Sequence, residues 1–232
     1  MWLVHVIGNT ADLARFDNNS TSLITIVNRD GAIFLSSHEF EGEQDPRVVV
    51  AKARDLCRVL QGLAKVVGHP IAFLNVGDPI WVDGDGNLHA FARDSVHVRD
   101  SVTLTLRNSD GVVLNTWSSE DIWTQFAQCA NRFPLARMAL MLWGGSTLTY
   151  RELVVILEII KYDDYATYQK FTSKTLDRLF ATANSMTAAG SQGRHGPTSG
   201  DTKQPPRNPM SLDEAVSLTG TILKAWLTAK AA

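Results

Sequence analysis

The spacing of apolar residues changes along this chain, and the change divides it into a β-rich first part and a helical second part. Up to residue 116, apolar residues occur mainly in short runs rich in β-branched side chains, separated by Gly, Asp and Asn. From Trp117 onward they recur every three or four residues instead. The first pattern is typical of strands and the second of one-sided helices. The sequence therefore predicts an α+β fold, with a β-rich domain over residues 1–116 and a helical domain over residues 117–232.

Short runs of β-branched and apolar residues in the first part predict the strands of an antiparallel sheet. Asn28-Arg29-Asp30-Gly31 is a turn signal, and we expect the runs on either side of it to form a hairpin. We expect the strands to follow one another as a meander with one solvated face. The expected strands cover residues 2–7, 23–27, 32–36, 71–76, 80–82, 88–93, 96–106 and 112–115.

One long helix is expected to interrupt these strands, over residues 45–67. Asp45 can cap its free amides, and Pro46 suits the first helical position, where the N–H that it lacks would have no partner. Apolar residues follow from Val49 to Ala64 at intervals of three and four, which places them on one face. We therefore expect this helix to pack across the sheet.

Capping signals mark the helices of the second part. Thr149 with Glu152 and Ser211 with Glu214 each fit a capping box, in which two polar side chains satisfy each other's backbone amides. Residues 186–209 are rich in Gly, Ser, Thr and Pro, which predicts an exposed loop. The second part is therefore expected to be a helical bundle that carries one long loop.

Charge and hydropathy limit the classes of function. The 232 residues carry 22 Lys and Arg against 24 Asp and Glu, a formal net charge of −2, so no overall field favours nucleic acid or an anionic membrane. No apolar run reaches the roughly 18–20 residues of a membrane span, and the first residues lack the features of a signal peptide. These observations predict a cytoplasmic protein with no membrane contact. Cys57 and Cys129 are expected to be reduced, buried thiols.

Motifs for metals and cofactors are weak in this sequence. Asp83-Gly84-Asp85-Gly86-Asn87 has the acidic residues of a calcium loop, but Gly and Glu are missing from the positions that an EF-hand requires. Asp-Gly and Gly-Asn suit a hairpin turn instead. The acidic stretch that follows His38 is interpreted as a solvated turn. Because a phosphate-binding glycine loop is also missing, neither a metal nor a cofactor is expected. The sequence also lacks a serine-nucleophile elbow, so a serine hydrolase is not supported.

The adjacent residues Arg194 and His195 are the candidate catalytic pair. Histidine can act as an acid or base near neutral pH, and arginine can stabilise negative charge that develops on a phosphate. Such a pair could cleave RNA without a metal, with His195 activating a 2′-hydroxyl and Arg194 stabilising the pentacovalent phosphorane. In the alternative interpretation the pair is structural: Arg194 binds a carboxylate or a helix C-terminus, and His195 bonds the backbone.

A set of residues in the last third of the chain forms a recognisable pattern. It comprises Asn184-Ser185, Ala189-Gly190, Arg194-His195-Gly196, Pro205-Pro206, Asn208-Pro209-Met210-Ser211, Glu214-Ala215 and Ala225-Trp226-Leu227. On these residues, the region resembles the C-terminal region of uncharacterised bacterial and mobile-element proteins. More distantly, the helical part is similar to HEPN domains, helical modules of toxin and phage-defence systems. HEPN ribonucleases place an Arg and, after a short spacer, a His at a dimer interface, whereas Arg194 and His195 are adjacent here.

Two functional hypotheses follow from the sequence. The first is a non-catalytic interaction or ligand-sensing module in a mobile-element or phage-defence context, with an unidentified ligand, a protein partner or a second copy of the chain bound to it. The second is a metal-independent, HEPN-like ribonuclease that acts on RNA through Arg194 and His195. The first is preferred because no catalytic set in the sequence is complete.

Overall fold

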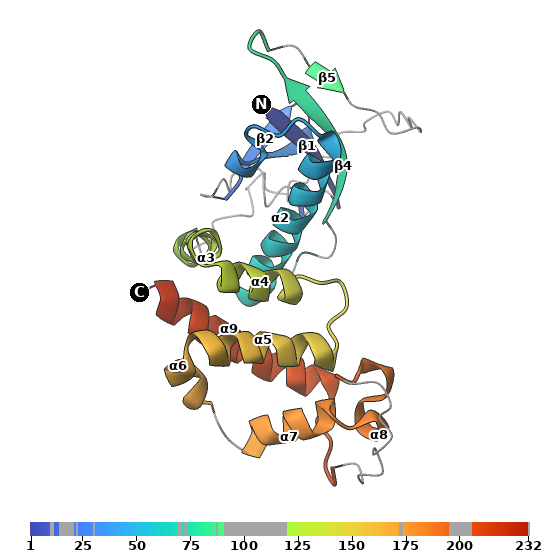
Figure 1. The fold of residues 1–232 in the computed structure, drawn as a ribbon, viewed down its shortest axis with the longest axis vertical. Coiled ribbons are helices and arrows are strands. Elements are labelled where there is room, and N and C mark those ends of the chain that lie inside the picture. Colours follow the sequence, from blue (N-terminus) through green and yellow to red (C-terminus); the bar gives the residue numbers. More distant parts are fainter. Residues whose placement is uncertain are drawn as a thin grey trace, which may run out of the picture. The chain divides into compact units, whose positions relative to one another are not determined.

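The computed structural model describes residues 1–9, 12–13, 21, 23–29, 31–68, 71, 74–86, 88–90, 120–171, 174–194 and 206–231. This part of the chain forms a five-stranded antiparallel sheet and eight α-helices, which confirms the α+β class (Figure 1). Two compact units are present: unit 1 is Met1–Arg58 with Ile71–Gln128, and unit 2 is Val59–Pro70 with Cys129–Ala232. Helix α2 (Pro46–Val66) therefore contributes residues to both units.

The sheet belongs to unit 1 and has β1 at its centre. Its strands are β1 (Trp2–Gly8), β2 (Thr25–Arg29), β3 (Ala32–Ser36), β4 (Leu74–Val82) and β5 (Leu88–Ala90). They are ordered β2-β3-β1-β4-β5, and each neighbouring pair is antiparallel. The predicted β2–β3 hairpin is confirmed, but the predicted meander is wrong. Strand β1 lies between β3 and β4 and not beside β2, so strands that follow one another in the sequence are not all neighbours in the sheet.

Strand β4 is a single strand, so the predicted break between residues 76 and 80 is wrong. The strand continues through Gly77-Asp78-Pro79, and its register with β1 shifts between Val4 and Val6. A bulge of this kind accommodates an extra residue and tolerates a proline, which explains how turn-forming residues remain within the strand. The space at Gly77 is also tight, since a Cβ there would lie 3.2 Å from the His5 Nδ1 atom and the His5 side chain would have to shift slightly.

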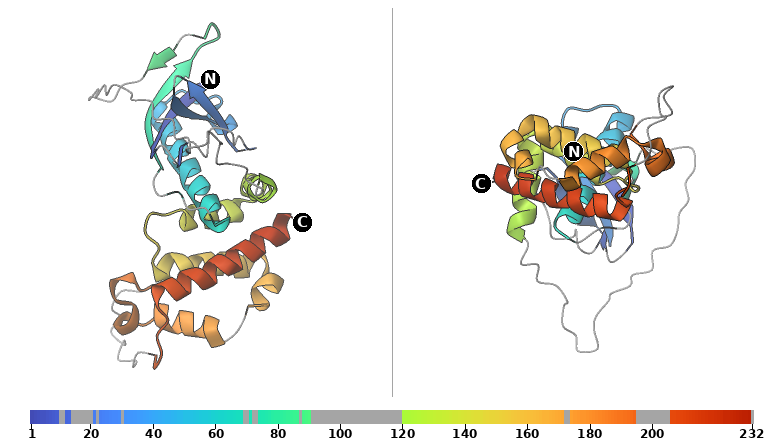
Figure 2. Two further views of the ribbon diagram at one scale, coloured as in Figure 1. Left: turned by 180° about the vertical axis from the view of Figure 1, so that it is seen from behind. Right: turned by 90° about the horizontal axis from the view of Figure 1, so that it is seen from below.

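Helix α2 confirms the predicted long helix to within one residue at each end. The Asp45 carboxylate accepts the backbone N–H of Arg47 at 2.8 Å, as expected of a residue that caps the helix. Within unit 1, α2 lies along the sheet inside the curve of β4 (Figures 1 and 2). Its apolar face there is buried, and it consists of Val49, Val50, Ala53, Leu56 and Cys57.

A tight turn joins β4 to β5, which confirms that the sequence around Asp83 is a hairpin turn. The Asp83 carboxylate accepts the N–H of Asp85 at 3.0 Å, and its carbonyl accepts the N–H of Gly86 at 3.2 Å. Gly86 has a φ of +85°, a conformation that glycine adopts most readily. The strand predicted at residues 88–93 begins as expected at Leu88, while those predicted at 96–106 and 112–115 lie outside the described residues.

Unit 2 is built mainly from helices. Besides the end of α2, its helices are α4 (Pro134–Trp143), α5 (Tyr150–Asp163), α6 (Tyr165–Gln169), α7 (Lys174–Ala183), α8 (Met186–Ala189) and α9 (Leu212–Ala231). Helix α3 (Glu120–Arg132) has residues 120–128 in unit 1 and residues 129–132 in unit 2. Helices α5 and α9 lie side by side, and both bury large apolar side chains (Figures 1 and 2). Trp226 of α9 is fully buried, and its indole N–H donates to the Asp163 carboxylate at 2.9 Å.

Both predicted capping boxes are confirmed. Thr149 and Glu152 start α5, with the Thr149 N–H donating to Glu152 Oε2 at 2.9 Å. Before α9, the Ser211 N–H donates to Glu214 Oε2 at 2.8 Å, and the Glu214 N–H donates to Ser211 Oγ at 3.2 Å. These bonds hold the pKa of the exposed Glu214 carboxyl below its ordinary value, with the Ser211 backbone as the largest cause.

Both cysteines are free and buried, as predicted. Burial raises the pKa of the Cys57 thiol to about 12 and also raises that of Cys129, so both thiols resist ionisation. Among the described residues, no helix combines the length and apolar character needed to cross a membrane.

Candidate functional site

Arg194, one of the two predicted catalytic residues, lies in unit 2 just after the short 3-10 helix η2 (Gly190–Gln192). Its backbone N–H donates to the carbonyl of Ala183, the last residue of α7, at 2.8 Å. Its guanidinium donates to Glu158 Oε1 of α5, also at 2.8 Å. The Arg194 side chain is 30% exposed and that of Glu158 45% exposed, so solvent screens this ion pair.

The structure does not test the predicted pairing of Arg194 with His195, because His195 lies outside the described residues. The predicted loop over residues 186–209 begins in the structure with α8 and η2, and residues 195–205 of it are outside the described part. What the structure does define is the ion pair between Arg194 and Glu158. A phosphate that bound this guanidinium would compete with the Glu158 carboxylate for it.

Helix α7 holds the segment that follows the loop, through the side chain of Arg178. The Arg178 Nε donates to the carbonyl of Asn208 at 2.8 Å, and one terminal nitrogen donates to the Pro209 carbonyl and to Glu214 Oε2, each at 3.0 Å. One guanidinium therefore binds two backbone carbonyls and the carboxylate of a capping box. Since Ala183 binds Arg194, α7 anchors the described residues on both sides of residues 195–205.

Two buried hydroxyls complete this anchor around Met210. The Thr182 hydroxyl accepts the N–H of Met210 at 2.9 Å, and the Tyr150 hydroxyl donates to the Met210 carbonyl. Burial raises the pKa of the Tyr150 phenol, so it remains a donor. The Asn-Pro-Met-Ser segment near the end of the chain is thus held in place by side chains of other helices. The sequence did not predict that Arg178 and Tyr150 take part in holding it.

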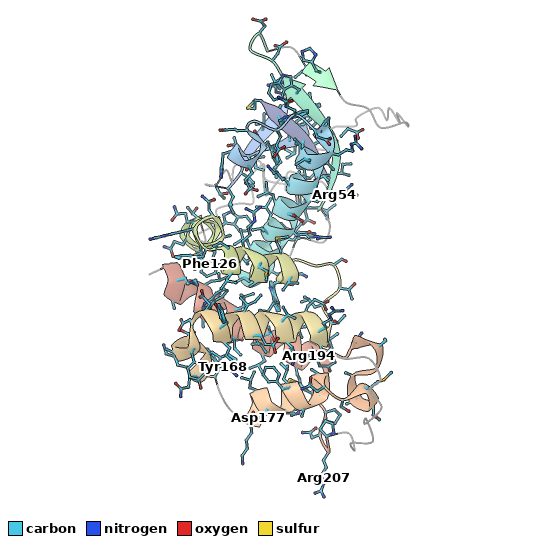
Figure 3. All side chains as sticks on the ribbon, viewed as in Figure 1. Arg54, Phe126, Tyr168, Asp177, Arg194 and Arg207 are labelled. Atoms are coloured by element: carbon cyan, nitrogen blue, oxygen red, sulfur yellow. The ribbon has the colours of Figure 1, made fainter. Side chains whose placement is uncertain are left out.

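The surroundings of Glu158 carry mixed charge and several tyrosines. Arg194, Tyr168 and Asp177 lie among helices α5, α6 and α7 (Figure 3). The Lys161 ammonium lies 5.7 Å from the centroid of the Tyr168 ring. Burial, followed by the charge of Asp177, raises the pKa of the Tyr168 phenol. Carboxylates offset the cations here, so these described residues do not form the positively charged groove that tracks a nucleic-acid backbone.

Unit 1 contains a cavity of about 540 Å³, to which β1, β2, β3, β4 and the 3-10 helix η1 (His38–Phe40) contribute residues. Its apolar wall includes two tryptophans on neighbouring strands. Trp2 pairs with Trp81 across β1 and β4, and the two rings meet edge to face with their centroids 5.1 Å apart. The Trp2 indole N–H donates to the Glu43 carbonyl at 2.9 Å, which fixes the ring against the loop after η1.

Some polar groups at this cavity are already engaged. The Ser36 hydroxyl donates to the Trp2 carbonyl at 3.0 Å, and the Ser37 hydroxyl donates to the Leu23 carbonyl at 2.7 Å. The Met1 amino nitrogen donates to the Val82 carbonyl at 2.7 Å. These groups hold strands and loop together and are poorly placed to bind a ligand.

Other polar side chains at the cavity have no such engagement. Thr25, His38 and Glu41 are exposed, and none makes a side-chain hydrogen bond or ion pair with the rest of the described chain. The Thr21 hydroxyl accepts the N–H of Leu23 at 3.2 Å, while its own proton is not donated to a described residue. The cavity therefore combines an indole wall with polar groups that a ligand can satisfy.

Sequence reasoning interpreted His38 and its acidic neighbours as a solvated turn and did not find this cavity. The exposure of these residues agrees with a solvated turn. The interpretation from sequence did not include Trp2 and Trp81 in the site, because only the pairing of β1 with β4 brings them together. Within the described ranges, no three His, Cys, Asp or Glu side chains gather as the ligands of a metal would.

Two candidate sites are thus defined, the cavity of unit 1 and the anchored segment at Arg194 in unit 2. No protein-family model, curated protein or solved structure shows significant similarity to the chain. The resemblance to mobile-element proteins and HEPN domains therefore remains a prediction.

Proposed function

We propose that the protein is a non-catalytic, ligand-sensing module of the cytoplasm, and that it binds a small molecule in the cavity of unit 1. The observation that carries this proposal is the cavity itself, with about 540 Å³ of space beside two tryptophans. Small-molecule sites in proteins are typically clefts of about 300–1,000 Å³, mostly apolar, with a few polar groups that orient the ligand. Thr21, Thr25, His38 and Glu41 supply such groups here.

Binding fits this site better than catalysis. A histidine that acts as a base is usually oriented by a second hydrogen-bonding group, and it must lie within reach of the proton that it removes. His38 is exposed and its ring has no hydrogen-bond partner in the described chain. Among the described residues at the cavity, no side chain is therefore placed as an activated nucleophile with its base.

The ribonuclease hypothesis, with Arg194 and His195 acting on RNA, is the second proposal and has weaker support. Arg194 keeps about a third of its side chain exposed, but Glu158 neutralises its charge. The test is cleavage of mixed RNA in the presence of EDTA by the wild type and His195→Ala. A ribonuclease would lose activity with the substitution, whereas equal background from both proteins would exclude the hypothesis.

The ligand-sensing proposal is tested by filling the cavity. A library of small molecules of all charge types is screened for those that raise the melting temperature of the protein. We expect Thr25→Phe, which places an aromatic ring at the cavity, to abolish the shift produced by these compounds. Thr221→Phe, an equal change at an exposed position on α9, should leave the shift intact. The proposal fails if no compound shifts the wild type, or if both variants respond alike.

A further inference from the structure

Resting on the proposed function, we infer that the ligand of the unit 1 cavity is a small organic cation, such as a quaternary ammonium. The inference depends on the charges around the cavity and on its indole wall. It concerns the class of ligand, so it can fail while the cavity remains a binding site.

Three glutamates lie in η1 and the loop that follows it, and they differ in what they contact. Glu43 forms an ion pair with Lys52 of α2, whose ammonium also donates to the carbonyl of Glu39 at 2.7 Å. The Glu39 side chain is half-buried and is not at the cavity. Glu41 lines the cavity, is exposed, and has no cationic partner in the described chain. Lys52 is thus committed to Glu43 and to the Glu39 carbonyl, and the charge of Glu41 is available to a ligand.

No Lys or Arg side chain is among the described residues that line the cavity. The positive group there is the Met1 amino nitrogen, which donates to the Val82 carbonyl. An anion would therefore meet the Glu41 carboxylate with only the Met1 ammonium, which is already hydrogen-bonded, to offset the repulsion among the described lining residues. A cation would meet that carboxylate and lose little by leaving water at a partly exposed site.

The tryptophans add a second attraction for a cation. The face of an indole ring carries negative electrostatic potential, and it is the best of the aromatic side chains at binding ammonium groups. Trp2 is buried, with 4% of its surface exposed, and it uses its N–H on the Glu43 carbonyl, so the more exposed Trp81 is the indole that a ligand can reach more readily. Trp81 stands edge to face against Trp2 and is half-buried. A trimethylammonium group suits such walls because its charge is spread over methyl groups.

Three probes of one shape separate charge from fit. Choline carries a trimethylammonium group, 3,3-dimethylbutan-1-ol replaces it with a neutral tert-butyl group, and 3,3-dimethylbutanoate combines that tert-butyl group with a carboxylate. Titration calorimetry measures the dissociation constant of each with the full chain. We expect choline to bind about five- to tenfold more tightly than the neutral alcohol, and the anion to bind most weakly.

Substitution of Glu41 tests whether its carboxylate is responsible for the preference for a positively charged ligand. We expect Glu41→Gln to weaken choline binding about fivefold and to leave the affinity for the neutral alcohol unchanged. Asp85→Asn, which removes one negative charge at the exposed β4–β5 turn, should change neither. Equal effects of the two substitutions would mean that net charge, and not the cavity, attracts choline, and that would overturn the inference.

The outcomes also separate this inference from the proposed function. If the alcohol or the anion binds as tightly as choline, and Thr25→Phe abolishes that binding, the cavity is a ligand site but the cation inference is wrong. If none of the three binds and the library also gives no compound sensitive to Thr25→Phe, both the inference and the proposed function are wrong.

Discussion

The loop that carries Glu41 in unit 1 and the segment that precedes α9 in unit 2 are both rich in polar groups, but they use them differently. In unit 2, Arg178, Thr182 and Tyr150 bind the backbone of residues 208–210, so the segment satisfies its polar groups within the unit. In unit 1, His38 and Glu41 stand beside a cavity without partners in the described chain. Polar groups that satisfy one another stabilise a fold, whereas polar groups left open beside a cavity can recognise a ligand.

The largest effect on stability should come from removing the guanidinium that anchors the segment before α9. Arg178→Ala removes the donor to two backbone carbonyls and one of the donors to the Glu214 carboxylate, so we expect it to lower the free energy of unfolding by about 2 kcal/mol. Urea unfolding measures the loss. Arg207→Ala, a matched change at an exposed arginine, should cost close to nothing (Figure 3). Similar losses from the two variants would contradict the structural role of Arg178.

A smaller loss is expected from the Tyr150 hydroxyl. Tyr150→Phe removes the donor to the Met210 carbonyl and retains the ring, so the loss should be about 1 kcal/mol. Tyr162→Phe provides the control, since Tyr162 is 85% exposed. A Tyr150→Phe variant as stable as the wild type would mean that a water molecule replaces the phenol as the donor to the Met210 carbonyl.

The ion pair between Arg194 and Glu158 should contribute less again. Both side chains are partly exposed, and pairs of this kind typically contribute about 0.5 kcal/mol. A double-mutant cycle with Arg194→Ala and Glu158→Ala measures the coupling, which should fall as salt is added. A coupling above about 2 kcal/mol would be inconsistent with a screened surface pair and would indicate a more rigid structure around Arg194.

The smallest effect on stability is expected at the cavity of unit 1. His38→Ala and Glu41→Gln remove no side-chain hydrogen bond or ion pair with the described chain, so each should change the free energy of unfolding by less than about 0.5 kcal/mol. Glu41→Gln should nevertheless weaken choline binding. A large loss of stability from either variant would place these side chains with the structural groups of unit 2 and would remove the contrast between the two regions.

Local signals in the sequence predicted the elements that depend on neighbouring residues. The α2 helix, the turn at Asp83 and the capping boxes at Thr149 and Ser211 each follow from residues a few positions apart, because capping and turn formation are local. The central position of β1 was missed, since strand order depends on pairing between distant residues. Strand β4 was predicted as two strands because Gly77 and Pro79 look like a turn in the sequence. The bulge that accommodates them depends on the pairing of β4 with β1, which is also a distant contact.

The candidate sites were less predictable than the elements. Arg194 and His195 were found because they are adjacent, yet adjacency did not reveal that Glu158, on a helix far away in the sequence, binds Arg194. The Trp2–Trp81 wall joins residues from opposite ends of the sheet sequence, and only the β1–β4 register places them together. No local pattern in the sequence encodes such a contact.

Tryptophan side-chain NMR tests the central claim most directly, because tryptophans lie in both units. In ¹⁵N-labelled protein titrated with choline, the indole N–H signals of Trp2 and Trp81 should shift together with one dissociation constant. Those of Trp143 and Trp226, which are buried in unit 2, should stay in place. Shifts at Trp143 or Trp226 with none at Trp2 and Trp81 would contradict the assignment of ligand binding to the cavity of unit 1.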